Sequence, residues 1–163
     1  MIDISIIQQC AGNVHPFVMQ RIMHVETQHK PFAIGYRIVK NGQDYKLPKA
    51  PKTLGEAKYI ANWLYKNGYK YDAGIAQVNS TNFARFGVTP EDMFDTCKNL
   101  NIASKILTEF YINAKRTIKD NQLALKAAIS AYNSGKYYSE AGRQYVNKIV
   151  NVNIKVKYAE LSK

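Results

Sequence analysis

The sequence predicts a mainly α-helical single domain with at most a small β-hairpin. Apolar residues recur at intervals of three and four over several segments, which is the pattern of amphipathic helices. Proline and glycine interrupt residues 31–52, where a loop or a hairpin is expected. The chain has 163 residues, enough to bury a sizeable core. We expect one domain over residues 1–163, with its core at about 10–150 and a polar tail at 151–163.

The first long helix is predicted after Pro16, because four apolar residues recur there at helical spacing: Val14, Val18, Ile22 and Val25. This helix should break near Pro31, since the residue before a proline avoids helical geometry. A second helix is expected to begin at a capping-box pattern formed by Thr53 and Glu56 and to end before Gly68.

The second half of the chain begins with a short motif at residues 69–80 and continues with helical segments. Gly87 should stop a helical turn at residues 82–86, and the cap-then-proline pair at 89–90 should begin another. Gly135 is placed to end a helix whose small alanine face permits close packing. The longer helices are predicted at about 99–115, at 122–132 and around 145–149.

The formal net charge is +11, from 23 Lys and Arg against 12 Asp and Glu. Such an excess attracts polyanions, including nucleic acid and acidic cell-wall polymers. The basic residues are scattered and no nucleic-acid-binding motif accompanies them, so we expect no nucleic-acid partner. No apolar run reaches the length needed to cross a bilayer. We therefore expect a protein that does not span a membrane. We also expect it to be a monomer.

The two cysteines, Cys10 and Cys97, leave two interpretations open. They are either buried free thiols, as in a cytosolic protein, or one disulfide if the protein is exported. We favour the disulfide, which would close a long loop. The first seven residues lack the basic start and the cleavage site of a signal peptide. The chain is therefore either cytoplasmic or a mature form whose leader has been removed.

Two familiar kinds of catalytic site find little support in the sequence. His24 and His29 are five residues apart, whereas a zinc-binding helix places its two histidines four apart on one face. We expect neither a metal nor a cofactor. No Gly-x-Ser-x-Gly segment occurs, and neither cysteine lies in a nucleophile context.

A carboxyl group is the better candidate for catalysis. Glu26 falls one turn beyond Ile22 and Met23, so its side chain should point along the apolar stripe. Loss of hydration there would raise the pKa of the carboxyl toward general-acid use. The alternative is that Glu26 lies at the edge of the stripe and reaches solvent. Asp72 is a possible second carboxylate, although it is equally well explained as a turn residue.

Four motifs follow one another along the chain: Glu26-Thr27, Gly74-Ile75-Ala76-Gln77-Val78-Asn79, Ala131-Tyr132-Asn133-Ser134-Gly135 and Tyr145. In this order they resemble the motifs of lytic transglycosylases with the soluble-transglycosylase, lysozyme-like domain. The segments 31–35 and 94–100 make the chain similar to the specialised transglycosylases of type IV secretion and conjugation systems. The resemblance covers about residues 10–150 and implies a goose-type lysozyme or transglycosylase fold.

The resemblance also implies a chemistry. Glu26 would be the sole catalytic acid, cleaving the β-1,4 bond between N-acetylmuramic acid and N-acetylglucosamine and leaving a 1,6-anhydromuramoyl end. Substrate contact or positioning of Glu26 is implied for Thr27, Gln77, Tyr132, Asn133 and Tyr145. A structural role is implied for Gly74, Ile75, Ala76 and Asn79. A hydrogen bond from Tyr145 would oppose the effect of burial on Glu26, so the sequence leaves its net pKa open.

This sequence departs from the family pattern at two places. Thr27 stands where the family has serine, which keeps the hydroxyl but adds a methyl group. Ile75-Ala76 stands where the family has Leu-Met, which predicts a smaller subsite. Neither departure changes the expected acid, Glu26.

Three functions are consistent with these observations. The first is a periplasmic lytic transglycosylase that opens peptidoglycan locally for type IV secretion or conjugation machinery, with glycan strands and secretion components as partners. The second is a hydrolytic muramidase of the same fold, in which Asp72 places a water. The third is a non-catalytic glycan-binding assembly module.

Overall fold

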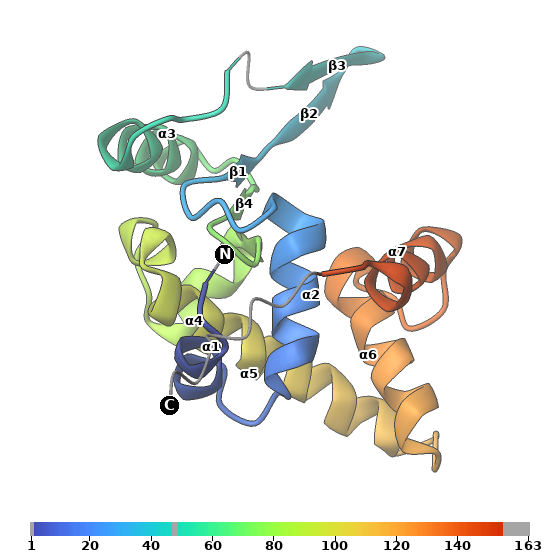
Figure 1. Ribbon diagram of the computed structural model, residues 1–163. Helices are drawn as coiled ribbons and strands as arrows, with labels where there is room; N and C mark the ends of the chain where they lie inside the picture. The colour runs from blue at the N-terminus through green and yellow to red at the C-terminus, as the bar shows by residue number, and fades with distance from the viewer. Residues whose placement is uncertain (1, 47–48, 155–163) are drawn as a thin grey trace, which may run out of the picture.

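The structure is a computed structural model that describes residues 2–46 and 49–154. A helical bundle forms its lower part, and a smaller part with α3 and the strands lies above the end of α2 (Figure 1). Most of the predicted tail, residues 155–163, lies outside the described residues. The helices are α1 (Ile4–Cys10), α2 (Pro16–Thr27), α3 (Leu54–Lys66), α4 (Phe83–Phe86), α5 (Thr96–Lys115), α6 (Asn121–Ser134) and α7 (Glu140–Asn151), with 3-10 turns η1 (Ser80–Asn82) and η2 (Glu91–Phe94).

Helix α2 ends at Thr27, a few residues before Pro31. Gln28 and His29 both adopt positive φ angles, of 53° and 64°, so the chain leaves the helix through two left-handed residues. At its other end, Pro16 occupies the first turn and the ring of His15 accepts a hydrogen bond from the amide of Phe17. Glu26 is therefore placed in the last turn of a well-delimited helix.

Helix α3 begins at the predicted cap. The Thr53 hydroxyl accepts from the Glu56 amide at 3.2 Å, while the Glu56 carboxylate accepts from the Lys52 amide at 2.7 Å. Helix α5 begins at Thr96, three residues before the predicted start. The reason is Asp95, whose carboxylate caps the helix by accepting from the Lys98 amide at 2.8 Å.

Two small antiparallel sheets complete the fold. The expected hairpin is present as β2 (Arg37–Lys40) and β3 (Gln43–Lys46), joined by Asn41-Gly42, whose φ angles are positive as this tight turn requires. A three-stranded sheet goes beyond the prediction. It has the order β1 (Ile34–Gly35), β4 (Asp72–Ala73), β5 (Val78–Asn79). Strands of two residues are too short to show an alternating pattern in sequence.

The main core surrounds α2, whose residues Met19, Ile22 and Met23 are fully buried. Helices α1, α5 and α7 and the strands contribute to the same core, and a small separate cluster of alanines lies between α5 and α6. The predicted mainly helical, lysozyme-like fold is confirmed. Within the described residues, no helix is long and apolar enough to cross a membrane.

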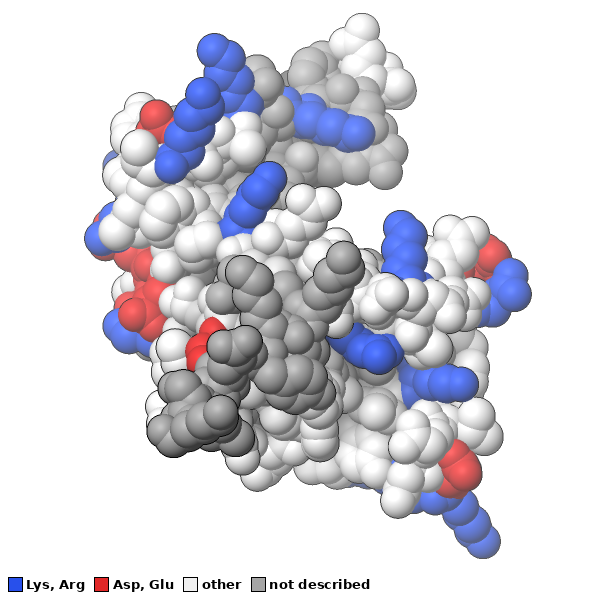
Figure 2. All heavy atoms as spheres, in the orientation of Figure 1, with Lys and Arg blue, Asp and Glu red and all other residues white. Residues whose placement is uncertain are grey.

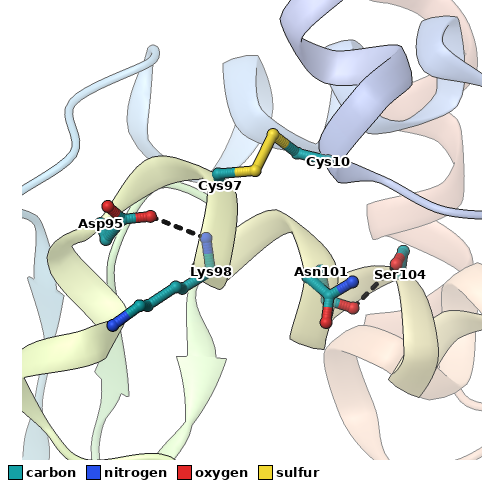
Figure 3. The surroundings of a disulfide bond; sticks show 6 residues. All are labelled: Cys10, Asp95, Cys97, Lys98, Asn101 and Ser104. Atoms are coloured by element: carbon teal, nitrogen blue, oxygen red, sulfur yellow. Dashed lines mark hydrogen bonds between the residues drawn. A yellow bond between two sulfur atoms is a disulfide. The ribbon is translucent and has the colours of Figure 1, made fainter.

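A disulfide joins Cys10 at the end of α1 to Cys97 in the first turn of α5, as Figure 3 shows. The two residues are 87 apart in sequence. Asp95 caps the same turn of α5. Of the two interpretations that the sequence left open, the structure has the disulfide.

We expect the double variant Cys10→Ser, Cys97→Ser to lose about 4 kcal/mol of unfolding free energy, because the unfolded chain is no longer closed into an 87-residue loop. Denaturant titration followed by circular dichroism measures this loss. The unfolding free energy of wild-type protein, measured in strong reductant, should equal that of the double variant. Equal stability of oxidised wild type and variant would contradict the expectation.

Candidate active site

The site is built around Glu26, in the last turn of α2. The residue is partly exposed but its carboxyl is largely buried, and the Tyr145 hydroxyl donates a hydrogen bond to Oε1 at 2.6 Å. Tyr145 lies on α7 and is only 6% exposed. A residue 119 positions away along the chain thus fixes the orientation of the carboxyl.

Burial raises the pKa of Glu26 from the usual 4.5 to about 7. Loss of hydration is the largest cause, and the nearby negative charge of Asp72 adds to it. The hydrogen bond from Tyr145 and the positive charge of Lys148 act in the opposite direction without cancelling it. A carboxyl with this pKa can both give and take a proton near neutral pH.

Close packing of α6 and α7 places Tyr145 against Glu26. Gly142, one turn before Tyr145, lies against Ser130 of α6, and a Cβ at this position would be 1.9 Å from the Ser130 hydroxyl oxygen. That hydroxyl donates to the carbonyl of Lys136 at 2.8 Å, which fixes the connection between the two helices. A side chain at this position would require Ser130 to move, so the glycine lets α7 approach α6 closely.

The second sequence motif forms the loop between β4 and β5, which passes beside Glu26. Thr27, next to Glu26, donates its hydroxyl to the carbonyls of Ile75 at 2.8 Å and Met23 at 3.2 Å. Tyr132 on α6 donates its hydroxyl to the carbonyl of Ala76 at 2.6 Å. The side chains of Thr27 and Tyr132 therefore fix the position of the β4–β5 loop through hydrogen bonds to its backbone.

The predicted contact of Thr27 with substrate stays a prediction, and the structure gives its hydroxyl a role within the protein. Its side chain is buried, with the residue only 8% exposed, and its single hydroxyl hydrogen is directed to backbone carbonyls. The role that the structure gives Thr27 is to tie the loop to the end of α2. The hydroxyl shared with the serine of the family pattern is sufficient for that role.

Gln77 also contributes to the loop. Its φ of 52° is left-handed, and its amide group donates to the carbonyls of Gly74 at 2.9 Å and Ala33 at 3.2 Å. The amide oxygen lies so close to Gly35 of β1 that a Cβ there would be 2.5 Å away. Gln77 thus joins the loop to β1 while still lining the cavity described below.

Asn79 and Asp72 face each other across strands β4 and β5. The Asn79 amide donates to the Asp72 carboxylate at 2.9 Å, and its oxygen accepts from the amide and hydroxyl of Thr81. Asn79 therefore joins β5 to both Asp72 and Thr81 through its side chain. Burial raises the pKa of Asp72, although the hydrogen bond from Asn79 opposes the effect.

A polar cavity of about 410 Å³ lies between the strands and α6. The exposed Asn133 belongs to its wall. Glu26 is not part of the wall, but it interacts with two of its residues: the charge of Asp72 raises the pKa of Glu26, and the charge of Glu26 raises the pKa of Tyr132. In Figure 2 the surface is hollowed between the upper part and the part that contains α7. Other residues lining the cavity are Gln77, Asn79, Thr81, Asn82, Arg85, Phe110 and Ser134.

The sequence profile of the transglycosylase SLT domain family matches residues 3–150. The chain belongs to this family. In this transglycosylase SLT domain the Tyr145 hydroxyl holds the Glu26 carboxyl.

Curated relatives carry the same domain in longer chains. The chain is 38% identical over 149 residues to the "Type IV secretion system protein virB1" of Brucella suis, covering 88% of this chain and 60% of the relative. It is 28% identical over 142 residues to "Protein virB1" of Agrobacterium fabrum, covering 87% and 55%. The chain thus spans little more than half the length of these relatives. No solved structure matches it significantly.

The sequence motifs gave no role to Asn99, although it lies within the segment 94–100 of this SLT domain. Asn99 in α5 is fully buried and makes hydrogen bonds with Ala73, Ala76 and Met93 around the β4–β5 loop. A signal was present: an amide side chain precedes Leu100 and Ala103 at the start of the apolar stripe of α5. A polar residue in such a stripe needs a buried partner.

The described part of the domain holds no group of three or more His, Cys, Asp or Glu residues suited to a metal. His24 and His29 meet edge to face, with ring centroids 5.6 Å apart. Burial is the main cause that lowers the pKa of His29, and His24 adds to the effect. These two histidines therefore pack against each other.

We expect Tyr145→Phe to raise the pKa of Glu26 above about 7, by roughly one unit, because the donor that stabilises the carboxylate is removed while burial remains. Carbon-13 NMR titration of the side-chain carboxyl, assigned with Glu26→Gln, measures the shift. Tyr59→Phe removes the hydroxyl of a tyrosine that is 73% exposed and serves as the matched control. An unchanged or lowered pKa in Tyr145→Phe would show that this hydrogen bond does not act on Glu26 as described.

Proposed function

We propose that this domain is a lytic transglycosylase that cleaves peptidoglycan glycan strands. The observation that carries the proposal is the largely buried Glu26, whose pKa of about 7 and hydrogen bond to Tyr145 equip it for proton transfer beside a polar cavity. The scissile bond is the β-1,4 linkage between N-acetylmuramic acid and N-acetylglucosamine.

In the first step, protonated Glu26 gives its proton to the glycosidic oxygen. The bond from that oxygen to C1 of the muramic residue breaks, and the N-acetylglucosamine hydroxyl leaves. The acetamide of the muramic residue stabilises the positive charge that develops at C1. Tyr145 stabilises the carboxylate that Glu26 becomes, because its hydroxyl already donates to Oε1.

In the second step, the Glu26 carboxylate takes the proton of the muramic C6 hydroxyl. The oxygen of that hydroxyl attacks C1 and forms the 1,6-anhydro ring. The proton returns to Glu26 and no water is consumed. Because one group acts first as acid and then as base, a pKa near neutrality suits both steps.

The cavity walls and the surface charge support a saccharide substrate with acidic groups. The exposed Asn133 offers an amide group at the cavity, and Gln77 and Tyr132 belong to the same wall. The net charge of +11 favours the acidic peptide stems and lactyl groups of peptidoglycan. Lysine and arginine are spread over the face seen in Figure 2, around the hollow.

We further propose the setting of a type IV secretion or conjugation apparatus in the periplasm, where this monomeric domain opens the wall locally. The printed name of the Brucella relative, a type IV secretion system protein, supports this setting. The Cys10–Cys97 disulfide is suited to an oxidising compartment.

A hydrolytic muramidase is the second candidate, because Asp72 lines the cavity and its charge acts on Glu26. In that reaction Asp72 would place a water that attacks C1, and the product would have a reducing end. Two features favour the transglycosylase. Asn79 already engages the Asp72 carboxylate, and burial raises the pKa of Asp72.

Mass spectrometry of the soluble products from purified peptidoglycan separates the candidates. We expect anhydromuropeptides from wild type, a loss of at least about a thousandfold in Glu26→Gln, and the same anhydro product from Asp72→Asn. Reducing-end products that disappear in Asp72→Asn would establish the hydrolase. If neither wild type nor Glu26→Gln releases products while both bind glycan, the domain is a binding module.

A further inference from the structure

The side chain of Asn99 grips both ends of the turn that carries the second sequence motif. Its amide nitrogen donates to the carbonyl of Ala73 at 2.9 Å, and its oxygen accepts from the amide of Ala76 at 3.0 Å. The nitrogen also donates to the carbonyl of Met93 at 3.0 Å, which ties in η2. Both donors of the Asn99 amide and one acceptor site are thus used inside the protein.

The turn between Ala73 and Ala76 is shaped around this side chain. Gly74 has a φ of 80°, and a Cβ there would lie 2.2 Å from the Asn99 nitrogen and 2.0 Å from the Met93 carbonyl oxygen. The backbone of Gly74 therefore lies so close to the Asn99 side-chain amide that only glycine, which has no Cβ, fits there. Loss of the Asn99 amide would leave buried carbonyl and N–H groups of the turn without partners.

The opposite side of the turn contacts the residues around the acid. Ile75 accepts from Thr27, the neighbour of Glu26, and Ala76 accepts from Tyr132. A shift of the turn would therefore disturb the end of α2 and the wall of the cavity together. The hydrogen bonds described for Asn99 go to Ala73, Ala76 and Met93, which are neither Glu26 nor residues lining the cavity.

We propose that Asn99 is a positioning residue, which holds the turn 73–76 against Thr27 and Tyr132 and so keeps water away from the Glu26 carboxyl. Its effect on catalysis rests on the proposed function, whereas its effect on the hydration of Glu26 does not. The position of Asn99 is itself fixed, because Asp95 caps the first turn of α5 and Cys97 is tethered to α1 (Figure 3).

The charged and titratable groups that act on Glu26 come from three elements. Tyr145 and Lys148 belong to α7, Asp72 to β4, and Tyr132 to α6. Replacing Asn99 with an uncharged residue changes none of these groups. A change in the titration of Glu26 in such a variant would therefore report on hydration and geometry.

The test compares Asn99→Ala and Asn99→Asp with wild type and with Ser104→Ala. Asn99→Asp keeps the volume and the acceptor for Ala76 but turns an oxygen toward the carbonyls of Ala73 and Met93. Ser104 is a matched control, since it is a buried polar residue of α5 whose hydroxyl donates within its own helix, to Asn101 at 2.8 Å (Figure 3). Folding of each variant is checked by circular dichroism.

We expect kcat on peptidoglycan fragments to fall roughly ten- to a hundredfold in both Asn99 variants, with KM changed less than about threefold. The Glu26 pKa, measured by carbon-13 NMR in Asn99→Ala, should fall from about 7 toward 4.5 as water reaches the carboxyl. The alkaline limb of the pH–rate profile should move to lower pH by the same amount. Ser104→Ala should change neither kcat nor this limb.

Three results would overturn the positioning role. The first is that the pKa of Glu26 in Asn99→Ala equals its value in wild type. The second is that Ser104→Ala loses as much kcat as the Asn99 variants do. The third is failure of both Asn99 variants to fold, which would mean that Asn99 serves the whole fold. Failure of the proposed function is a separate result, seen as the absence of anhydro products from wild type. The NMR titration still tests the Asn99 proposal in that case.

Discussion

The Glu26 carboxyl lies at the end of α2, where the protein has replaced most of the water around it. The fully buried Ile22 and Met23 lie one turn below, and Tyr145 supplies the hydrogen bond that orients the group. Burial and this hydrogen bond act in opposite directions on the pKa, and burial dominates. Three features together shape the surroundings of the Glu26 carboxyl. They are the position of α7, the packing of Gly142 on α6 and the course of the β4–β5 loop.

The β4–β5 loop has little regular structure of its own, so its shape comes from side chains on three helices. Thr27 of α2, Asn99 of α5 and Tyr132 of α6 hydrogen bond to backbone atoms within four consecutive residues, 73–76. Irregular backbone persists in a buried place only when its polar groups are satisfied in this way. The disulfide and the Asp95 cap hold the start of α5 in place, and so they fix the position from which Asn99 hydrogen bonds to the loop.

Local signals in the sequence predicted the helices correctly and placed Glu26 at the end of an apolar stripe. The Thr53–Glu56 cap, the Gly135 stop and the apolar stripe leading to Glu26 each depend on neighbouring residues. Long-range partners were harder to predict. The two-residue strands have no visible period, and Asn99 acts on residues 23 to 26 positions away. The burial of Thr27 was also hard to predict, because a motif gives a residue type at a position, whereas burial depends on the loop that covers it.

The most direct test of the account is the pH dependence of stability in wild type against Glu26→Gln. Below pH 4.5 the carboxyl is protonated in both the folded and unfolded chains and contributes nothing. Between about pH 4.5 and pH 7 the unfolded chain releases the carboxyl proton while the folded chain keeps it, so the unfolding free energy of wild type should fall by about 3 kcal/mol relative to the variant and level off above pH 7. Parallel curves for the two proteins between pH 4 and pH 8 would contradict a buried acid at the centre of this site.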